Sequence, residues 1–260
     1  EHLRQQTLVP AEIGGAEIII AANACTDGTI AEAEAARAGL EAKGWSLVVL
    51  DLSEAGKLNA LNTADPLAKG NVRAYLDADV HCSPDLLRQI YEALDVDIPR
   101  YASGRLRIAP AKTWVTRHYA KVWTRLPFMK TNVPGAGIFA VNAAGRARWD
   151  EFPSIIADDG FVRLKFEPQE RVMVEADYSW PLVEGFKRLV KVRRRQDAGV
   201  RELEAKFPEI MGNESKPPMR PKDHLELFWG TPLSYLVYIS VMITVKLGGK
   251  QDFTAWTRGR

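Results

Sequence analysis

Three short apolar runs, separated by segments of helical character, restrict the fold of this chain more than any other feature. The runs are residues 16–24 (AEIIIAANA), 45–52 (WSLVVLDL) and 71–79 (NVRAYLDAD). Their length and their Ile, Val and Leu content are typical of buried strands. A helix is predicted between the first two runs, over residues 30–44, and a helix or loop over residues 57–70. This alternation predicts an α/β fold with a doubly wound sheet and helices on both faces.

Polar residues follow two of the predicted strands at the point where each strand ends. Residues 23–27 follow the first run, and residues 77–79 end the third run. In doubly wound sheets, ligands bind beyond the carboxyl ends of the strands. We therefore expect both polar clusters at one rim of the sheet, where they would form a binding site.

Asp77 and Asp79 are the first pair of residues that could carry chemistry. On an extended segment, residues i and i+2 point the same way, so both carboxylates can face one site. Carboxylate oxygens suit Mg²⁺ or Mn²⁺, whose remaining ligands are phosphate oxygens and water. The alternative is that the two acids cap the helix predicted to start near Ser83 and Pro84.

Asp158 and Asp159 form a second acidic pair, directly before a predicted helix. A carboxylate beside another carboxylate has a raised pKa, which suits a general base. The alternative is again a helix cap, because the helix dipole favours acids in the first turn.

A basic helix is predicted over residues 184–199 (EGFKRLVKVRRRQDAG). Residues 187, 191 and 194 or 195 share one face of it, and that face is either solvated, in contact with phosphate or in contact with an anionic membrane. The formal net charge of the whole chain is only +2, so it is not an electrostatic nucleic-acid binder. Two cysteines, Cys25 and Cys82, are too few for a disulfide framework and favour a reducing compartment such as the cytoplasm.

Residues 233–245 (LSYLVYISVMITV) form an apolar stretch near the end of the sequence. It is shorter than the ~20 residues needed to cross a bilayer. It is therefore either a buried element or a membrane-surface helix. The cations that follow it, Lys246, Lys250, Arg258 and Arg260, would suit an anionic surface.

Taken in order, these pieces resemble the family-2 inverting glycosyltransferases. The motifs that carry the resemblance are IIIAANACTDGT (18–29), GKLNALN (56–62), YLDAD (75–79), PGAGIFAVNAAG (134–145), ADDGFVRLKF (157–166) and RRRQDAG (193–199). The resemblance covers residues 1–200, and residues 201–260 would form a C-terminal extension. It implies a GT-A fold, with a mixed sheet, and a nucleotide-sugar donor, with UDP-sugars expected.

The resemblance also implies roles for residues at the matching positions. Asn23 matches the position that reads the donor base, Asp27 and Lys57 match donor-site positions, and Asp77 matches the acid near the ribose and the sugar. Arg194, or a neighbour, stands in for a basic helix motif of the family that is absent here. This absence favours a single addition over processive synthesis.

The chemistry of the family is implied at two further positions. Asp79 matches the metal ligand on the diphosphate, so the implied cofactor is Mg²⁺ or Mn²⁺, and Asp159 matches the base, with Asp158 beside it. The acceptor is not implied by these positions. The basic helix, the apolar stretch 233–245 and the cations after it suggest an anionic membrane surface, so our hypothesis is a glycan or lipid-linked acceptor at the inner face of the cell membrane, in polysaccharide assembly. The family opens with a strand that this sequence does not contain. Either the sequence omits an N-terminal segment, which we favour, or the protein lacks a central strand, which would leave a polar slot in its core.

Two other functions remain open at this point. A sugar-nucleotide pyrophosphorylase would also use an α/β sheet and Mg²⁺, although no Gly-rich phosphate loop is found in the sequence. A membrane-associated scaffold with a degenerate transferase fold would explain Asn23, but Asp77, Asp79 and Asp159 argue for catalysis.

Overall fold

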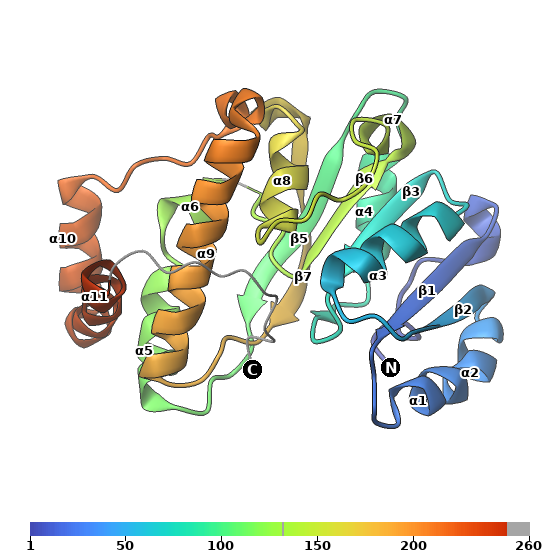
Figure 1. Ribbon diagram of the computed structural model, residues 1–260, viewed down its shortest axis with the longest axis horizontal. Coiled ribbons are helices and arrows are strands. Elements are labelled where there is room, and N and C mark those ends of the chain that lie inside the picture. Colours follow the sequence, from blue (N-terminus) through green and yellow to red (C-terminus); the bar gives the residue numbers. More distant parts are fainter. Residues whose placement is uncertain (132, 249–260) are drawn as a thin grey trace.

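The computed structural model describes residues 1–131 and 133–248, and for residues 130 and 131 it describes the backbone alone. Figure 1 shows two groups of strands, with helices packed around both. A two-stranded parallel sheet is formed by β1 (Ala16–Asn23) and β2 (Trp45–Leu52). A five-stranded sheet has the order β3-β6-β5-β7-β4. Its strands are β3 (Val72–Leu76), β4 (His81–Cys82), β5 (Tyr101–Ile108), β6 (Ile138–Asn142) and β7 (Arg171–Trp180).

The five-stranded sheet is mixed. β5 and β7 are parallel, whereas β6 runs antiparallel to both β3 and β5, and β4 runs antiparallel to β7. Helices cover both of its faces, as the alternation of buried residues along β6 makes clear. Ile138 and Ala140 pack against α4 (Leu86–Leu94), while Phe139 and Val141 pack on the opposite face against α8 (Asp158–Leu164). The predicted α/β class, with helices on both faces of a mixed sheet, is confirmed.

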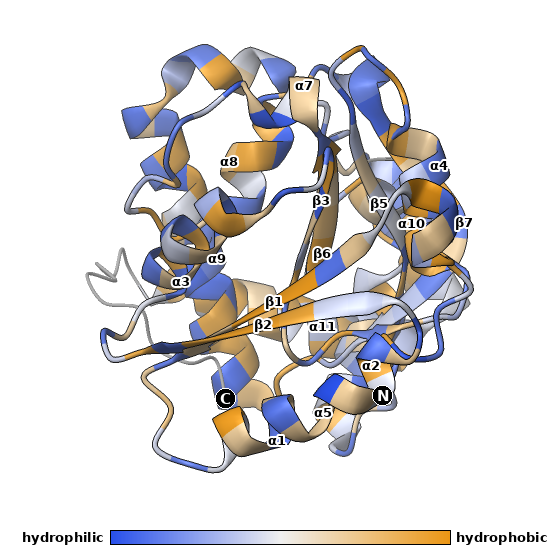
Figure 2. Ribbon diagram, turned by 90° about the vertical axis from the view of Figure 1, so that its right-hand side faces the viewer, coloured by the Kyte–Doolittle hydropathy of each residue, from blue (hydrophilic) through white to orange (hydrophobic). Residues whose placement is uncertain are grey.

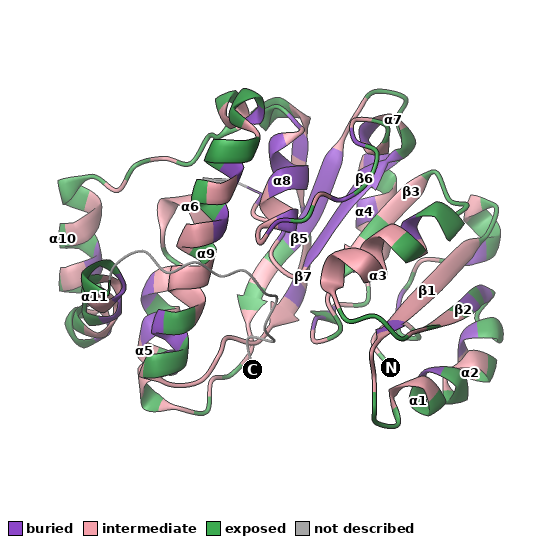
Figure 3. Cartoon of the chain, in the orientation of Figure 1, coloured by how far each residue is buried: buried purple, intermediate pink, exposed green. Residues whose placement is uncertain are grey.

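The two sheets are not joined by hydrogen bonds between strands. Among the described strands, β1 pairs with β2 alone, and β3 pairs with β6 alone. Figure 3 shows β6 largely buried and β1 largely half-buried, and Figure 2 shows that β1 is nonetheless apolar. The facing edges of β1 and β3 line one end of a cavity of about 2700 Å³. Among the described residues, the edges of β1 and β3 therefore face a cavity instead of another strand.

The N-terminal elements follow the predicted boundaries with three differences. Residues 2–5 form hydrogen-bonded turns before a 3-10 helix, η1 (Pro10–Ile13), although the sequence of residues 1–12 (EHLRQQTLVPAE) is typical of the end of a helix that runs into a turn. The helix predicted over 30–44 is split into α1 (Thr29–Ala35) and α2 (Arg37–Glu41). The third strand ends at Leu76, before the acids, and α3 (Lys57–Ala64) with η2 (Asp65–Leu67) occupies the segment left as helix or loop.

Helices form a separate layer in the second half of the chain. Its long member is α9 (Phe186–Lys206), so the boundary predicted at residue 200 falls inside a helix. The remaining helices are α5 (Trp114–Trp123), α6 (Pro127–Thr131), α7 (Ala143–Arg146), η3 (Pro168–Glu170), η4 (Pro208–Asn213), α10 (Pro221–Gly230) and α11 (Pro232–Leu247).

The apolar stretch near the end of the sequence forms α11, which is buried on one face and exposed on the other. One face packs on α5 and α9 through Val241 and Val245, which are buried. The other face is exposed and carries apolar side chains. We call it, together with its continuation on α10, the α10–α11 apolar face: Leu225, Trp229, Leu233, Leu236, Ile243 and Leu247. Across the described ranges no helix is both long and apolar enough to span a bilayer. Lys250, Arg258 and Arg260 lie outside the described residues.

Candidate active site

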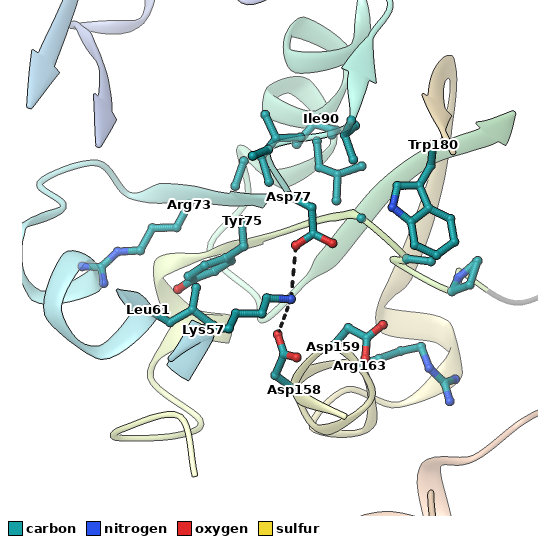
Figure 4. Close-up of a pocket in the computed structure, with 18 of the residues that line it drawn as sticks. Lys57, Leu61, Arg73, Tyr75, Asp77, Ile90, Asp158, Asp159, Arg163 and Trp180 are labelled. Carbon is teal, nitrogen blue, oxygen red and sulfur yellow. Dashed lines mark ion pairs between the residues drawn. The ribbon is translucent and has the colours of Figure 1, made fainter. Parts of the chain in front are cut away.

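Lys57 joins three parts of the fold at the rim of the sheet. It is the first residue of α3, and Gly56 before it has φ of 148°, a conformation open to glycine. The Lys57 Nζ lies 3.2 Å from Asp77 Oδ1, just after β3, and 2.8 Å from Asp158 Oδ2, at the start of α8. Figure 4 shows these two ion pairs at the centre of the cavity. The structure therefore brings together three residues predicted from separate motifs.

The charges of this cluster depend on one another. Burial opposes the charged form of Lys57, but the carboxylates of Asp158 and Asp77 outweigh it and raise the pKa of the ammonium above its ordinary value. Burial also raises the pKa of Asp77, against the lowering effect of Lys57, and the nearby Asp158 and Asp79 carboxylates add to the rise. The ammonium of Lys57 thus interacts with three carboxylates, those of Asp77, Asp158 and Asp159, in a partly desolvated site.

Asp158 and Asp159 are the first two residues of α8, but neither caps it. The N-cap is Ala157, and no side chain accepts a capping hydrogen bond there. Asp158 is buried against Lys57, and Asp159 accepts a hydrogen bond of 2.7 Å from the backbone N–H of Gly160. Burial, and then repulsion from Asp158, raise the pKa of Asp159 to about 6. A carboxylate with this pKa can accept a proton near neutral pH, as a general base must.

Asp79 lies in the same cavity, two residues after Asp77. The helix that follows, α4, begins at Leu86 with Asp85 as its N-cap, so Asp79 is not its cap. Across residues 1–131 and 133–248, no group of three or more His, Cys, Asp or Glu residues could hold a metal. Mg²⁺ and Mn²⁺ often use one or two carboxylates and complete their shell with phosphate oxygens and water. Asp79, beside an Asp77 that is held by Lys57, fits that kind of site.

The other predicted donor-site residues differ in position. Asn23 lines the cavity at the end of β1, and its side-chain oxygen accepts a 2.9 Å hydrogen bond from the backbone N–H of Gly56. It therefore fixes the start of α3, where Lys57 lies. Asp27 is exposed, does not line the cavity, and accepts hydrogen bonds from the backbone and hydroxyl of Thr29 at the start of α1.

Arg194 points away from the cavity. Its guanidinium donates a 2.8 Å hydrogen bond to the carbonyl of Thr244 on α11. Its neighbours Arg193 and Arg195 line the cavity instead. The predicted basic helix thus faces the cavity, with residues other than Arg194.

Two further cavity residues were not identified from the sequence. Arg163, one turn after Asp159 on α8, is buried and donates to Glu214 at 2.6 Å. Trp180 ends β7, at the carboxyl end of a strand. The rule that pointed to Asn23 and Asp77 also applies to Trp180, once the segment 171–180 is assigned as a strand.

Comparisons with known proteins agree on the type of fold. A family model described as glycosyl transferase family 2 matches residues 1–152, more than half of the chain. The mannosyltransferase PcManGT of Pyrobaculum calidifontis, solved in complex with GDP-Man and Mn²⁺, is similar in structure, with a TM-score of 0.54 and 18% identity over 96% of this chain and 70% of that chain. TarS residues 1–349 of S. aureus, in complex with UDP-GlcNAc, gives a TM-score of 0.49 and 13% identity over 95% of this chain and 86% of that one. No curated protein matches significantly.

Proposed function

The chain belongs to glycosyltransferase family 2, and from that premise we propose that it transfers a hexose from a nucleotide sugar to an acceptor hydroxyl with inversion of the anomeric centre. One observation carries the proposal. Asp159, whose pKa is raised to about 6, lies in the cavity that also holds the Lys57–Asp77 ion pair and Asp79. A base and a charged donor site are thus close together.

Asp159 removes the proton from the acceptor hydroxyl in the proposed reaction. The acceptor oxygen then forms a bond to the anomeric carbon, and the bond from that carbon to the nucleotide diphosphate breaks on the opposite face. A single displacement of this kind inverts the configuration. Asp158 keeps Lys57 beside the base and raises the pKa of Asp159 toward neutrality.

The donor would lie along the rim from Asn23 to Asp79. Asn23 would contact the nucleobase of the donor, and Asp77 its ribose and sugar. Lys57 and Arg193 would place positive charge beside the diphosphate. Arg194 and Asp27 remain weaker candidates, because their side chains bind α11 and Thr29. Asp79, with Asp77, would hold Mg²⁺ or Mn²⁺. Such an ion neutralises charge on the leaving diphosphate when it is bound.

Replacing Asp79 with asparagine is expected to remove the metal-dependent part of donor binding. At a donor concentration 100 times its Kd, binding adds about 2.7 kcal/mol and raises Tm by about 5–10 °C. A thermal-shift screen of UDP-, GDP- and dTDP-sugars, each with and without Mn²⁺, measures this rise in Tm and identifies the nucleobase of the donor. Asp150→Asn, at an exposed residue outside the cavity, is the control. An Asp79→Asn variant with the full metal-dependent rise would contradict the assignment.

Glycosyl transfer is favoured over both alternatives. The family match is to glycosyltransferases and gives no support to a pyrophosphorylase. A scaffold would not need a half-buried Asp159 beside an ion pair with the buried Asp158, since such groups are costly to desolvate. Release of nucleoside diphosphate from a donor in the presence of Mn²⁺ would exclude the scaffold directly.

A glycan or lipid-linked acceptor at the inner face of a bacterial membrane, in cell-surface polysaccharide assembly, is our proposal for the second substrate. It is supported by the α10–α11 apolar face, on which Trp229 is 77% and Leu236 57% exposed. An exposed tryptophan beside leucines suits the boundary between headgroups and acyl chains. Arg220, Lys222 and Lys246 are exposed at the ends of these two helices and can contact anionic lipid.

In a flotation assay, the protein is expected to float with vesicles that contain phosphatidylserine, and less so at high salt because charge attraction is screened. Combined substitution of Trp229 and Leu236 by serine should reduce the bound fraction at least about threefold, since it removes apolar area from the contact. Val200→Ser, at a residue 48% exposed on α9, is the matched control. No flotation of the wild-type protein at low salt would overturn the membrane proposal without affecting the transfer proposal.

A further inference from the structure

Trp180 is a cavity residue to which the proposed reaction assigns no role. It is the last residue of β7, and its backbone is fixed there by pairing with Ile108 of β5 and by a 3.0 Å hydrogen bond from the N–H of Ala109 to its carbonyl. Its indole is half-buried and lines the cavity. Its N–H has no hydrogen-bond partner among residues 1–131 and 133–248. A donor and an aromatic face are therefore presented to the cavity.

A single residue, Gly137, lies between the indole of Trp180 and the segment that holds Asp77. A Cβ on Gly137 would lie 3.0 Å from Cδ1 and 3.3 Å from Nε1 of Trp180. The carbonyl of the same glycine accepts a 2.8 Å hydrogen bond from the backbone N–H of Asp77. The glycine, with φ of 84°, thus allows the ring to approach the segment that holds Asp77.

A second tryptophan supports the first. Trp123, the last residue of α5, lies with its ring centroid 6.4 Å from that of Trp180, at an angle of 41°. The separation is within the range of an aromatic contact, and the two rings are tilted against each other. Trp123 also lines the cavity, so the two rings form a continuous aromatic wall.

The orientation of the base indicates which substrate this wall serves. Figure 4 shows the Asp158 carboxylate turned toward Lys57, and the Asp159 carboxylate turned to the side of the cavity where Trp180 lies. A general base must be within hydrogen-bond reach of the hydroxyl that it deprotonates. The acceptor hydroxyl therefore belongs on the Trp180 side, while the donor belongs on the Lys57 side.

We propose that the Trp180–Trp123 wall is an acceptor subsite that stacks a pyranose ring. The assignment of this subsite to the acceptor rests on the proposed function. The binding of a sugar to the Trp180–Trp123 wall does not depend on it. A pyranose has a face of C–H groups, which matches an indole face, and a rim of hydroxyls, which matches the indole N–H and the nearby carboxylates. The acceptor is thus a saccharide at its reacting end.

The direct test is fluorine NMR on protein labelled with 5-fluorotryptophan. The chain has seven tryptophans, and Trp180→Phe, Trp123→Phe and Trp114→Phe assign three of the signals. Methyl glycosides of glucose, galactose, mannose and N-acetylglucosamine are the probes. At least one should shift the Trp180 signal saturably, and leave that of Trp114, which is 49% exposed and outside the cavity, unchanged. The subsite is overturned if no glycoside shifts Trp180, or if Trp114 shifts equally.

A kinetic test separates this subsite from the reaction itself. With a glycoside that accepts sugar, Trp180→Ala should raise the acceptor KM about 3- to 10-fold, the size of an aromatic contact, and Trp180→Phe much less. The donor-induced rise in Tm should be kept, and Trp114→Ala should leave the KM unchanged. Glycoside binding at Trp180 without any transfer would refute the proposed function alone. Transfer by Trp180→Ala with wild-type acceptor KM would refute the subsite alone.

Discussion

Replacement of Asp159 by asparagine is expected to slow sugar transfer about 10²–10⁴-fold, the usual contribution of a general base, while donor binding is retained. Asparagine has nearly the shape of aspartate but cannot take the proton. In the wild-type enzyme, transfer should fall tenfold for each pH unit below about 6, where Asp159 is protonated. Steady-state rates as a function of pH, with donor binding followed by thermal shift, measure both effects. Near wild-type turnover by this variant would show that another group is the base.

The same substitution should stabilise the fold at neutral pH. The pKa of Asp159 rises from the ordinary 3.8 to about 6 on folding, so the folded protein binds more protons than the unfolded chain between these values. Stability therefore falls as pH increases through this window, and stays lower above it. Asparagine removes the buried charge, and we expect Tm to rise by a few degrees at pH 8 and hardly at all at pH 4. An equal change at both pH values would mean that the effect is not due to ionisation.

Replacement of Lys57 by methionine should abolish transfer and destabilise the protein at neutral pH. Methionine keeps the apolar stem but removes the charge that holds Asp77 and Asp158. Loss of one partner from a buried ion pair costs several kcal/mol, and the one-third exposure of Lys57 reduces this to about 2 kcal/mol. We expect Tm to be about 4–8 °C lower at pH 7.5, and transfer to fall by at least about 10²-fold.

The destabilisation by Lys57→Met should be largely relieved at pH 5. Without the ammonium, repulsion raises the pKa values of the remaining carboxylates, which then take up protons as the pH falls and lose their mutual repulsion. The wild-type ammonium stays charged throughout this range, because its pKa is raised above its ordinary value. Melting curves from pH 4.5 to 8 measure the effect, with Lys43→Met at an exposed position as the control. A deficit in Tm that does not depend on pH would indicate a packing defect.

Strands β1 and β2 could be predicted from the sequence because their signals are local, whereas β4 and β5 were not predicted. Runs of Ile, Val and Leu placed β1 and β2 to within one residue of their observed bounds. The break between α1 and α2 had no local signal in a uniform Ala- and Glu-rich segment. There, Arg37 donates a 2.7 Å hydrogen bond to the carbonyl of Leu47 on β2, a contact that depends on tertiary structure.

The motifs of the site could be predicted from the sequence one by one. Their contacts with one another in the fold could not be predicted. The carboxyl-end rule placed Asn23 and Asp77 on one rim, but nothing in the sequence indicated that Lys57 pairs with Asp158, which lies far from it in the sequence. The rotation of α9 was equally hidden. Helical periodicity gives the faces of a helix, but not which face meets the sheet, and so Arg193 rather than Arg194 lines the cavity.

Because β1 and β3 are not paired, the ion pairs of Lys57 also contribute to the contact between the two sheets. Among the described strands none pairs across the two sheets, and α3 connects them through its side chains. Asn62 exchanges two hydrogen bonds with the backbone of Phe152, and Lys57 attracts Asp77 and Asp158. The charges of Lys57, Asp77 and Asp158 thus also help to hold the two sheets together. When Asp159 gains or loses a proton, the net charge near Lys57 changes, and so does the electrostatic attraction between the two sheets. The protonation state of Asp159 is therefore coupled to the contact between the sheets.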